Sequence, residues 1–150
     1  EIQALVSKSS FGYARRRAQG FDYNRLALLI AVLEKRIGLH LEAEDVFVNV
    51  AGGIKVEDPT ADLAVALAIA SAFREEPVVP ETVVLGEIGL AGEIRSISQA
   101  VLRINEAQKL GFKACLLPKN NYKNLNYEKN DIELIPVSTL KEALDIALRR

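Results

Sequence analysis

The sequence predicts one α+β domain in which mixed β-sheets pack against helices. The chain has 150 residues, a length that suits a single domain. Short runs of β-branched and apolar residues alternate with segments whose apolar residues recur at helical spacing. The front half is expected to be antiparallel, and the end follows a strand-helix-strand-helix order. This mixture of patterns is typical of α+β domains.

The chain begins with a strand and a polar segment. Residues 2–6 are mainly apolar and predict a short strand, whereas residues 8–20 are polar and end at glycine. We expect this second segment to be a loop.

A helix and a second strand should follow. Asp22 or Asn24 can cap a helix that ends at Gly38, because glycine favours helix termination. Its apolar face is formed by Leu26, Leu29, Ile30, Leu33 and Ile37. Residues 45–50 are rich in β-branched side chains and predict a strand.

The middle of the chain predicts a buried helix and a hairpin. Asp58 followed by Pro59 is typical of a helix start. Residues 63–73 are apolar on nearly all sides, so this helix should be buried. Residues 82–88 and 93–97 are expected to form two strands around a glycine-bounded turn.

The end of the chain alternates helices and strands. Ser98 is expected to cap a helix that ends at Gly111, and residues 114–117 predict a strand. A polar loop at 118–130 and a strand at 132–135 should follow. Thr139 and Glu142 have the spacing of a capping box for the last helix.

Composition limits the functional classes. The formal net charge is −1, so any nucleic-acid contact must use a local basic patch. With one cysteine, Cys115, and one histidine, His40, the chain has no internal disulfide and no ordinary structural zinc site. Cys115 lies in an apolar run and is expected to be buried, and His40 is expected at the surface. No apolar run is long enough to span a bilayer, so we expect a cytoplasmic protein without a membrane partner.

Three segments resemble a known family. They are residues 1–6, residues 45–71 and residues 84–95, and residues 24–26 fit as well. All are similar to the C-terminal Lon-protease-like domain of the RadA (Sms) family of bacterial DNA-repair ATPases. The resemblance implies a Lon proteolytic-domain-like sandwich, related to the second domain of ribosomal protein S5. It also implies that residues 1–150 are one domain cut from a longer chain.

The resemblance assigns two positions that would be catalytic in Lon-type peptidases. Thr60 stands where those enzymes have the nucleophilic serine, and Val101 stands where they have the lysine base. A hydroxyl nucleophile needs an adjacent base, and valine cannot accept a proton. Asp62 replaces a glycine, and its charge would oppose an oxyanion. We therefore expect no catalytic residues and interpret Thr60 as a structural residue of the early helix.

The resemblance also implies partners. Families of this kind form homohexameric rings, bind single-stranded and branched DNA, and act with RecA in branch migration. No phosphate-binding loop motif occurs here, and ATP, magnesium and zinc are implied only for the absent N-terminal parts, a zinc finger and a RecA-like ATPase. This chain should contain no cofactor of its own.

Basic residues are the candidate DNA contacts, because phosphates attract lysine and arginine. The cluster Arg15, Arg16 and Arg17 is flanked by Phe11, Tyr13 and Phe21, although a solvated basic face would give the same pattern. Lys55, Arg95 and Arg25 belong to or adjoin the segments that resemble the family; Arg25 could instead pair with a carboxylate. The segment from Lys119 to Lys129 is a weaker candidate. The full set is Lys55, Arg95, Arg15, Arg16, Arg17 and Arg25.

Two other functions stay open at this point. An active Lon-type serine or threonine peptidase would need a base at a position other than 101. His40 and Lys55 are the conceivable bases, although a histidine like His40 is more often a surface or packing residue, and glycines and a loop separate Lys55 from Thr60. The N-terminal domain of magnesium-chelatase-like AAA proteins, such as ComM, shares the sandwich and a hairpin like residues 86–92. The first residues and the run from Gly52 to Lys55 favour the RadA family.

Overall fold

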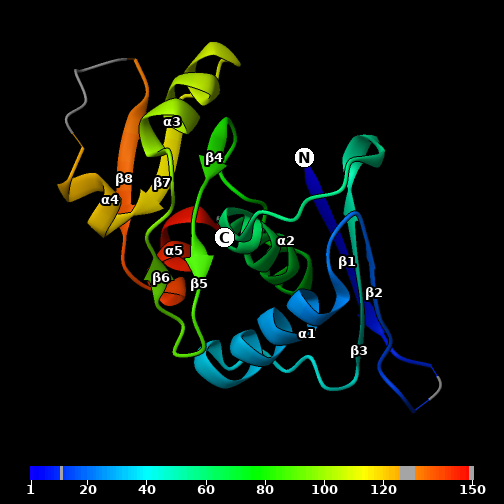
Figure 1. Ribbon diagram of the computed structural model, residues 1–150. Coiled ribbons are helices and arrows are strands. Elements are labelled where there is room, and N and C mark those ends of the chain that lie inside the picture. The colour runs from blue at the N-terminus through cyan, green and yellow to red at the C-terminus, as the bar shows by residue number, and fades with distance from the viewer. Residues whose placement is uncertain (11, 126–130, 149–150) are drawn as a thin grey trace.

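The computed structural model describes residues 1–10, 12–125 and 131–148. A three-stranded sheet, a layer of helices and a second three-stranded sheet lie side by side (Figure 1). A second helix layer covers the far face of the second sheet. The predicted α+β class, with mixed open sheets and packed helices, is confirmed.

The first sheet contains β1 (Ile2–Lys8), β3 (Glu44–Val50) and β2 (Arg16–Gln19), in that order. β1 is antiparallel to β3, but β2 is parallel to it, so the front half is not purely antiparallel. The expected loop at residues 8–20 was wrong in part, because its second half is strand β2. Tertiary pairing with β3 overrides the polar composition of this segment. Phe11 lies outside the described residues.

Helix α1 (Tyr23–Val32) connects β2 to β3 and continues as a π-helical turn, η1 (Leu33–Ile37). The Asp22 carboxylate accepts a hydrogen bond from the Arg25 N–H, and Gly38 ends the helix in a left-handed conformation. Both predicted ends are therefore confirmed, with Asp22 rather than Asn24 as the cap.

Helix α2 (Asp62–Arg74) is the central element. It follows two short turns, η2 (Ala51–Gly53) and η3 (Pro59–Ala61), and Asp58 caps η3 through the Thr60 N–H. The helix lies between the two sheets (Figure 1), as its apolar sequence predicts. Seven of its residues are buried: Asp62, Leu63, Val65, Ala66, Leu67, Ile69 and Ala70.

The segment expected as one strand at 82–88 is two strands. β4 (Thr82–Val84) joins the second sheet, and β5 (Glu87–Ile88) pairs with β6 (Ile94–Arg95) in a hairpin. The chain leaves the sheet between them because Gly86 is hydrogen-bonded to the start of α2, through its N–H to the Thr60 carbonyl and its carbonyl to the Leu63 N–H. The hairpin is confirmed, but β6 is shorter than the predicted strand at 93–97.

The second sheet has the order β4, β7 (Ala114–Pro118) and β8 (Glu133–Val137), and all its pairs are parallel. Helix α3 (Ala100–Lys109) covers one face, and α5 (Leu140–Ala147) packs on the other with α2. Thr139 caps α5 as predicted.

Two predictions in this half were wrong. Gln99, in a left-handed conformation, occupies the N-cap of α3, and the Ser98 carbonyl instead accepts a hydrogen bond from Arg103. The expected loop at 118–130 begins with a short helix, α4 (Lys119–Lys123). Residues 126–130 of that segment lie outside the described residues.

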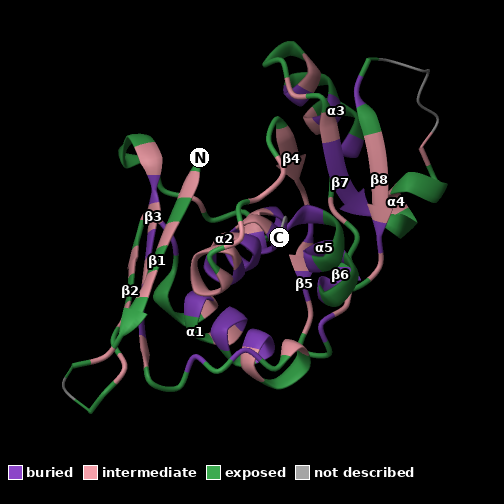
Figure 2. Cartoon of the chain, turned by 180° about the vertical axis from the view of Figure 1, so that it is seen from behind, coloured by how far each residue is buried: buried purple, intermediate pink, exposed green. Residues whose placement is uncertain are grey.

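The buried residues form two clusters. The main one joins α1, α2, α5 and the inner face of the first sheet, and the smaller one lies between α3 and the second sheet. Figure 2 shows burial concentrated in α2 and β7. Cys115 is buried in β7, as predicted, and burial raises the pKa of its thiol to about 12. Within the described ranges, no helix has the length and apolar character needed to cross a membrane.

Candidate functional site

Thr60 lies at the start of the central helix, and its side chain is buried, 6% exposed. Its backbone N–H donates a hydrogen bond to the Asp58 carboxylate, which caps this helix start. The Thr60 hydroxyl also interacts with this carboxylate and contributes to lowering its pKa. A buried residue at a capped helix start is consistent with the predicted structural role.

Asp58 is a poor base for Thr60. The hydrogen bond from the Thr60 N–H lowers the pKa of Asp58 below its ordinary value, against the opposing effect of partial burial. The Thr60 hydroxyl and Arg103 lower the same pKa further, and Arg103 Nη2 lies 2.7 Å from Asp58 Oδ2. A carboxylate with a depressed pKa accepts protons reluctantly. Asp58 is therefore a weak proton acceptor for the Thr60 hydroxyl and does not activate it as a nucleophile.

Val101 lies on α3, and its side chain is partly solvent-exposed at 41%. A lysine base is effective when burial holds it in the neutral form. The position that would hold the lysine in Lon-type peptidases therefore has neither the chemistry nor the full burial of such a base. His40, one of the two other conceivable bases, is exposed after η1 as expected, and Lys55 is exposed as well.

Asp62 is fully buried and serves the fold. Its carboxylate forms two hydrogen bonds with the Arg25 guanidinium and accepts a third from the Ile88 N–H, which is 3.1 Å away. The bond to Asp62 raises the pKa of Arg25 above its ordinary value. The anion at position 62 is therefore neutralised, so the expectation that its charge would oppose an oxyanion loses its basis. The pair connects α1, α2 and β5.

The candidate DNA contacts fall into three places. Arg25 is occupied with Asp62, and Arg16 donates to the Glu44 and Leu41 carbonyls. Arg15 forms an ion pair with buried Asp45, and Arg17 is exposed on β2. Thus the predicted cluster of three arginines is divided by strand alternation, since Arg16 points to the opposite side from its neighbours.

Lys55 lies near the cluster, and Arg95 does not. Lys55 is exposed and shares a small groove with Gln19 and Gly20 at the end of β2. Arg95 is on the β5–β6 hairpin, on the other side of α2 (Figure 1). There it lines a polar groove with Lys119 and Ser138, and its Nε lies 3.8 Å from Glu93.

Several contacts could not be found from sequence. The Arg103–Asp58 pair joins residues 45 positions apart, and the Arg25–Asp62 pair spans 37. The alternative that Arg25 pairs with a carboxylate is borne out, but the sequence did not identify Asp62 as its partner. In the described ranges, no group of three or more histidine, cysteine or acidic side chains could hold a metal ion.

Comparisons with known proteins identify the family. The family described as "Subunit ChlI of Mg-chelatase" matches residues 25–121, well over half of the chain. The chain is 49% identical over 150 residues to DNA repair protein RadA of Halalkalibacterium halodurans, covering 100% of this chain and 33% of that protein. It is 48% identical over 148 residues to DNA repair protein RadA of Listeria monocytogenes, covering 99% and 32%.

A third relative agrees with these two. DNA repair protein RadA of Streptococcus pneumoniae is 46% identical over 144 residues, covering 96% of this chain and 34% of that protein. The chain thus spans about a third of the length of the curated relatives that it matches. It belongs to the domain family described as subunit ChlI of Mg-chelatase, and it corresponds over its whole length to a region of the DNA repair proteins named RadA.

Proposed function

We propose that this chain is a non-catalytic, Lon-like domain of a RadA-type DNA-repair ATPase that contacts DNA and supports ring assembly. In this proposal, residues 1–150 are a C-terminal domain with the S5-related sandwich, and the parent chain is cytoplasmic. ATP, magnesium and zinc would be bound by a RecA-like ATPase and a zinc finger outside this chain. The parent would act on recombination intermediates with RecA and promote branch migration. High identity to proteins named DNA repair protein RadA supports it.

The observation that carries the non-catalytic part is that the carboxylate beside Thr60 is already held within the fold. Asp58 accepts a hydrogen bond from the Thr60 N–H, while Arg103 holds the same carboxylate. Val101 supplies no proton acceptor. Loss of one member of a catalytic dyad lowers the rate by roughly 10⁴. These features favour our proposal over an active Lon-type peptidase.

We expect no peptidase activity from the purified protein. Incubation with casein or a fluorogenic peptide should release no product above background, and Thr60→Ala should behave like the wild type. A Lon-type peptidase assayed in parallel shows that the substrates are adequate. Cleavage that disappears in Thr60→Ala would contradict the proposal and establish the peptidase alternative.

The DNA-binding part rests on cations that the fold leaves accessible. Lys55 and Arg17 lie along one side of the first sheet, and Arg95 with Lys119 forms a separate basic site on the hairpin side. We leave Arg16 and Arg25 out of the contact set because both guanidinium groups are engaged within the chain. Arg15 remains as a neighbour whose charge is shared with Asp45. In a hexameric ring, symmetry would repeat each cation six times, so a near-neutral domain could present a basic surface.

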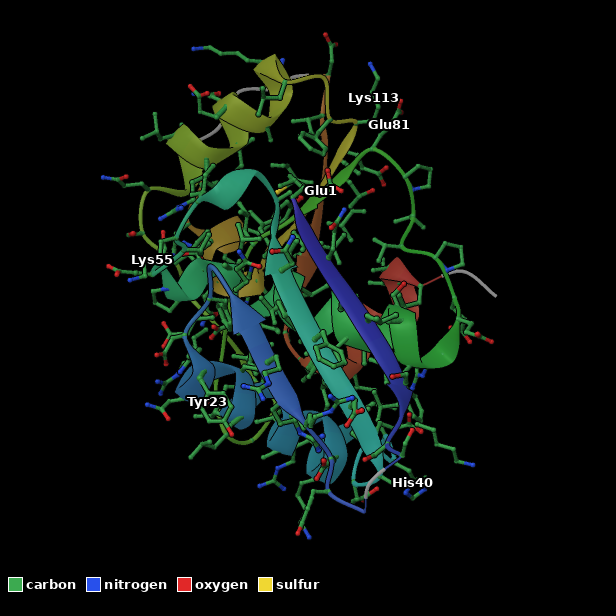
Figure 3. All side chains as sticks on the ribbon, turned by 90° about the vertical axis from the view of Figure 1, so that its right-hand side faces the viewer. Glu1, Tyr23, His40, Lys55, Glu81 and Lys113 are labelled. Carbon is green, nitrogen blue, oxygen red and sulfur yellow. The ribbon has the colours of Figure 1, made fainter. Side chains whose placement is uncertain are left out.

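DNA affinity should depend on these cations in the full-length protein. We expect Lys55→Ala and Arg95→Ala each to weaken binding to single-stranded and branched DNA and to flatten its salt dependence. For single strands, the slope of log affinity against log salt should fall by about 0.7 for each phosphate that the variant no longer neutralises. Lys113→Ala is the matched control, since Lys113 is an exposed lysine at another end of the molecule (Figure 3). Equal affinity and slope in both test variants and the control would remove Lys55 and Arg95 from the site.

We prefer this function to that of a magnesium-chelatase-like AAA protein of the ComM type. The ChlI match alone suits both, because it is a match to a domain family. The identity of 46–49% extends over nearly the whole chain in proteins named DNA repair protein RadA. That likeness includes the strand at the start of the chain, which the ChlI match does not cover.

A further inference from the structure

The outer face of the first sheet is uncovered in the described part of the chain. Helices α1 and α2 pack on its inner face, where Ala4, Val48 and Ala18 point. Figure 3 looks directly onto the opposite face, with β3 in the middle and β1 and β2 at its sides. No described helix lies over it.

The strand registers arrange the outer side chains in two rows. Leu5, Phe47 and Arg17 lie opposite one another, so that an aromatic ring is placed between an aliphatic side chain and a cation. The next row contains three amides, Gln3, Asn49 and Gln19. Together these residues line a hollow of about 660 Å³. Leu5 is 61% exposed and adds an apolar side chain to this open face.

The accessible cations of this face lie on the β2 side, whereas the exposed Glu1 carboxylate lies at the β1 side, beside Gln3. The nearest carboxylate on β3, Asp45, is held by the backbone and guanidinium of Arg15, and the Arg15 guanidinium carbon lies 5.7 Å from the Phe47 ring centre. Arg17 is exposed on β2, directly opposite Phe47. Lys55 lies close to Gln19, at the end of β2. Figure 3 shows Lys55 on the β2 side of the sheet.

Polar groups in the hollow are available for a ligand. Gln3 donates to the Glu1 carboxylate, 3.1 Å away. Within the described residues, no hydrogen bond or ion pair is found for the side chains of Arg17, Gln19 or Asn49. An aromatic ring, free amides and flanking cations on a sheet are the groups that bind unpaired nucleotides.

We propose that this face binds single-stranded DNA, with a base stacked on Phe47. Asn49 and Gln19 would hydrogen-bond to base edges, and Arg17 and Lys55 would contact the phosphates on the β2 side. The inference rests on the proposed DNA-binding function and specifies where and how the strand is held. A base in a duplex is already stacked and paired, so its faces cannot reach the ring. The surface therefore suits an unpaired strand, about two or three nucleotides per domain.

The test compares the full-length wild type with Phe47→Ala, Phe47→Leu, Arg17→Ala and Lys113→Ala, using oligothymidylate as the probe. Stacking on one aromatic residue contributes about 1–3 kcal/mol, which corresponds to an about 5- to 150-fold change in affinity. We expect a loss of this order in both Phe47 variants, because leucine preserves apolar area but has no ring. Their salt slope should stay at the wild-type value. Arg17→Ala should weaken binding and flatten the slope, and Lys113→Ala should do neither.

A second measurement identifies the contact directly. An oligothymidylate that carries a single 5-iodouracil should crosslink, on irradiation, to a residue on which that base stacks. In the wild type we expect the crosslink in the tryptic peptide 37–55, which contains Phe47. It should disappear in Phe47→Leu, while circular dichroism shows an unchanged fold. This readout does not depend on small differences in affinity.

Different failures have different meanings. If the wild type does not bind oligothymidylate at low salt, both the DNA-binding function and this inference are overturned. If the wild type binds but both Phe47 variants retain its affinity and the crosslink lies elsewhere, only the stacking site is overturned. If the Phe47 variants instead change the mass of the assembly in light scattering and leave DNA affinity per assembly unchanged, the face is a subunit interface and the inference is wrong.

Discussion

Replacing Asp62 with alanine should lower the free energy of unfolding by about 3 kcal/mol, near the lower end of the 3–5 kcal/mol range for a broken buried ion pair. The variant loses both bonds to Arg25 and leaves the Ile88 N–H without its acceptor. The lower end applies because the Arg25 side chain keeps 28% exposure and water can solvate part of the freed charge. Equilibrium unfolding in urea, followed by circular dichroism, measures the loss.

Asp145→Ala is the matched control for this change. Asp145 forms an exposed ion pair with Lys141 at 3.1 Å on α5, and such a pair contributes at most about 0.5 kcal/mol. Asp62→Asn should fall between the two, since its amide oxygen can still accept from Ile88 but carries no charge. A stability of Asp62→Ala within the error of Asp145→Ala would show that the buried pair is dispensable.

Replacing Gly20 with alanine should lower the free energy of unfolding by about 2–5 kcal/mol. Gly20 has φ +81°, a conformation that costs a residue with a Cβ about 1–2 kcal/mol. A Cβ there would also lie 2.5 Å from the Ile54 carbonyl oxygen and 2.8 Å from Val50 Cβ, and forcing atoms into such a space costs about 1–3 kcal/mol. Because the Ile54 oxygen is backbone, the segment that carries Lys55 would have to move.

Gly38→Ala separates the two contributions. Gly38 has φ +83°, but no heavy atom lies within 4 Å of a Cβ built there. It should lose only the conformational part, about 1–2 kcal/mol. Urea unfolding of the two variants side by side is the measurement. Equal losses at both positions would mean that the chain around Gly20 relaxes without cost, contrary to our interpretation of its packing.

Local signals predicted most helix ends, with Ser98 as an exception, and pairing between distant segments determined which residues form strands. Asp22, Asp58, Thr139 and Gly38 act at helix ends where the sequence placed them, because capping depends on a few adjacent residues. Strand β2 was missed because its polar residues become a strand only through the register with β3. The split of residues 82–88 likewise depends on hydrogen bonds from Gly86 to the start of α2.

The candidate site shows the same contrast between local signals, which the sequence carries, and contacts between distant segments, which it does not. Sequence singled out Thr60, Val101 and the basic residues, but it could not show that Arg16 and Arg25 are engaged within the fold. The partners of these side chains come from other elements. Phe47 was within a predicted strand, yet only the registers with Leu5 and Arg17 place it at the centre of an open face. Pairwise contact between distant segments carries no local sequence signal.

The position of α2 has a mechanical consequence. Together with α1 and α5 it forms the layer of helices between the two sheets, so a load on the outer face of the first sheet must pass through this common wall to reach the second. Well-packed interiors compress little and transmit strain. The smaller cluster beneath α3 does not share this wall. The domain should therefore move as one stiff block, with α3 as the part of its surface that can loosen first.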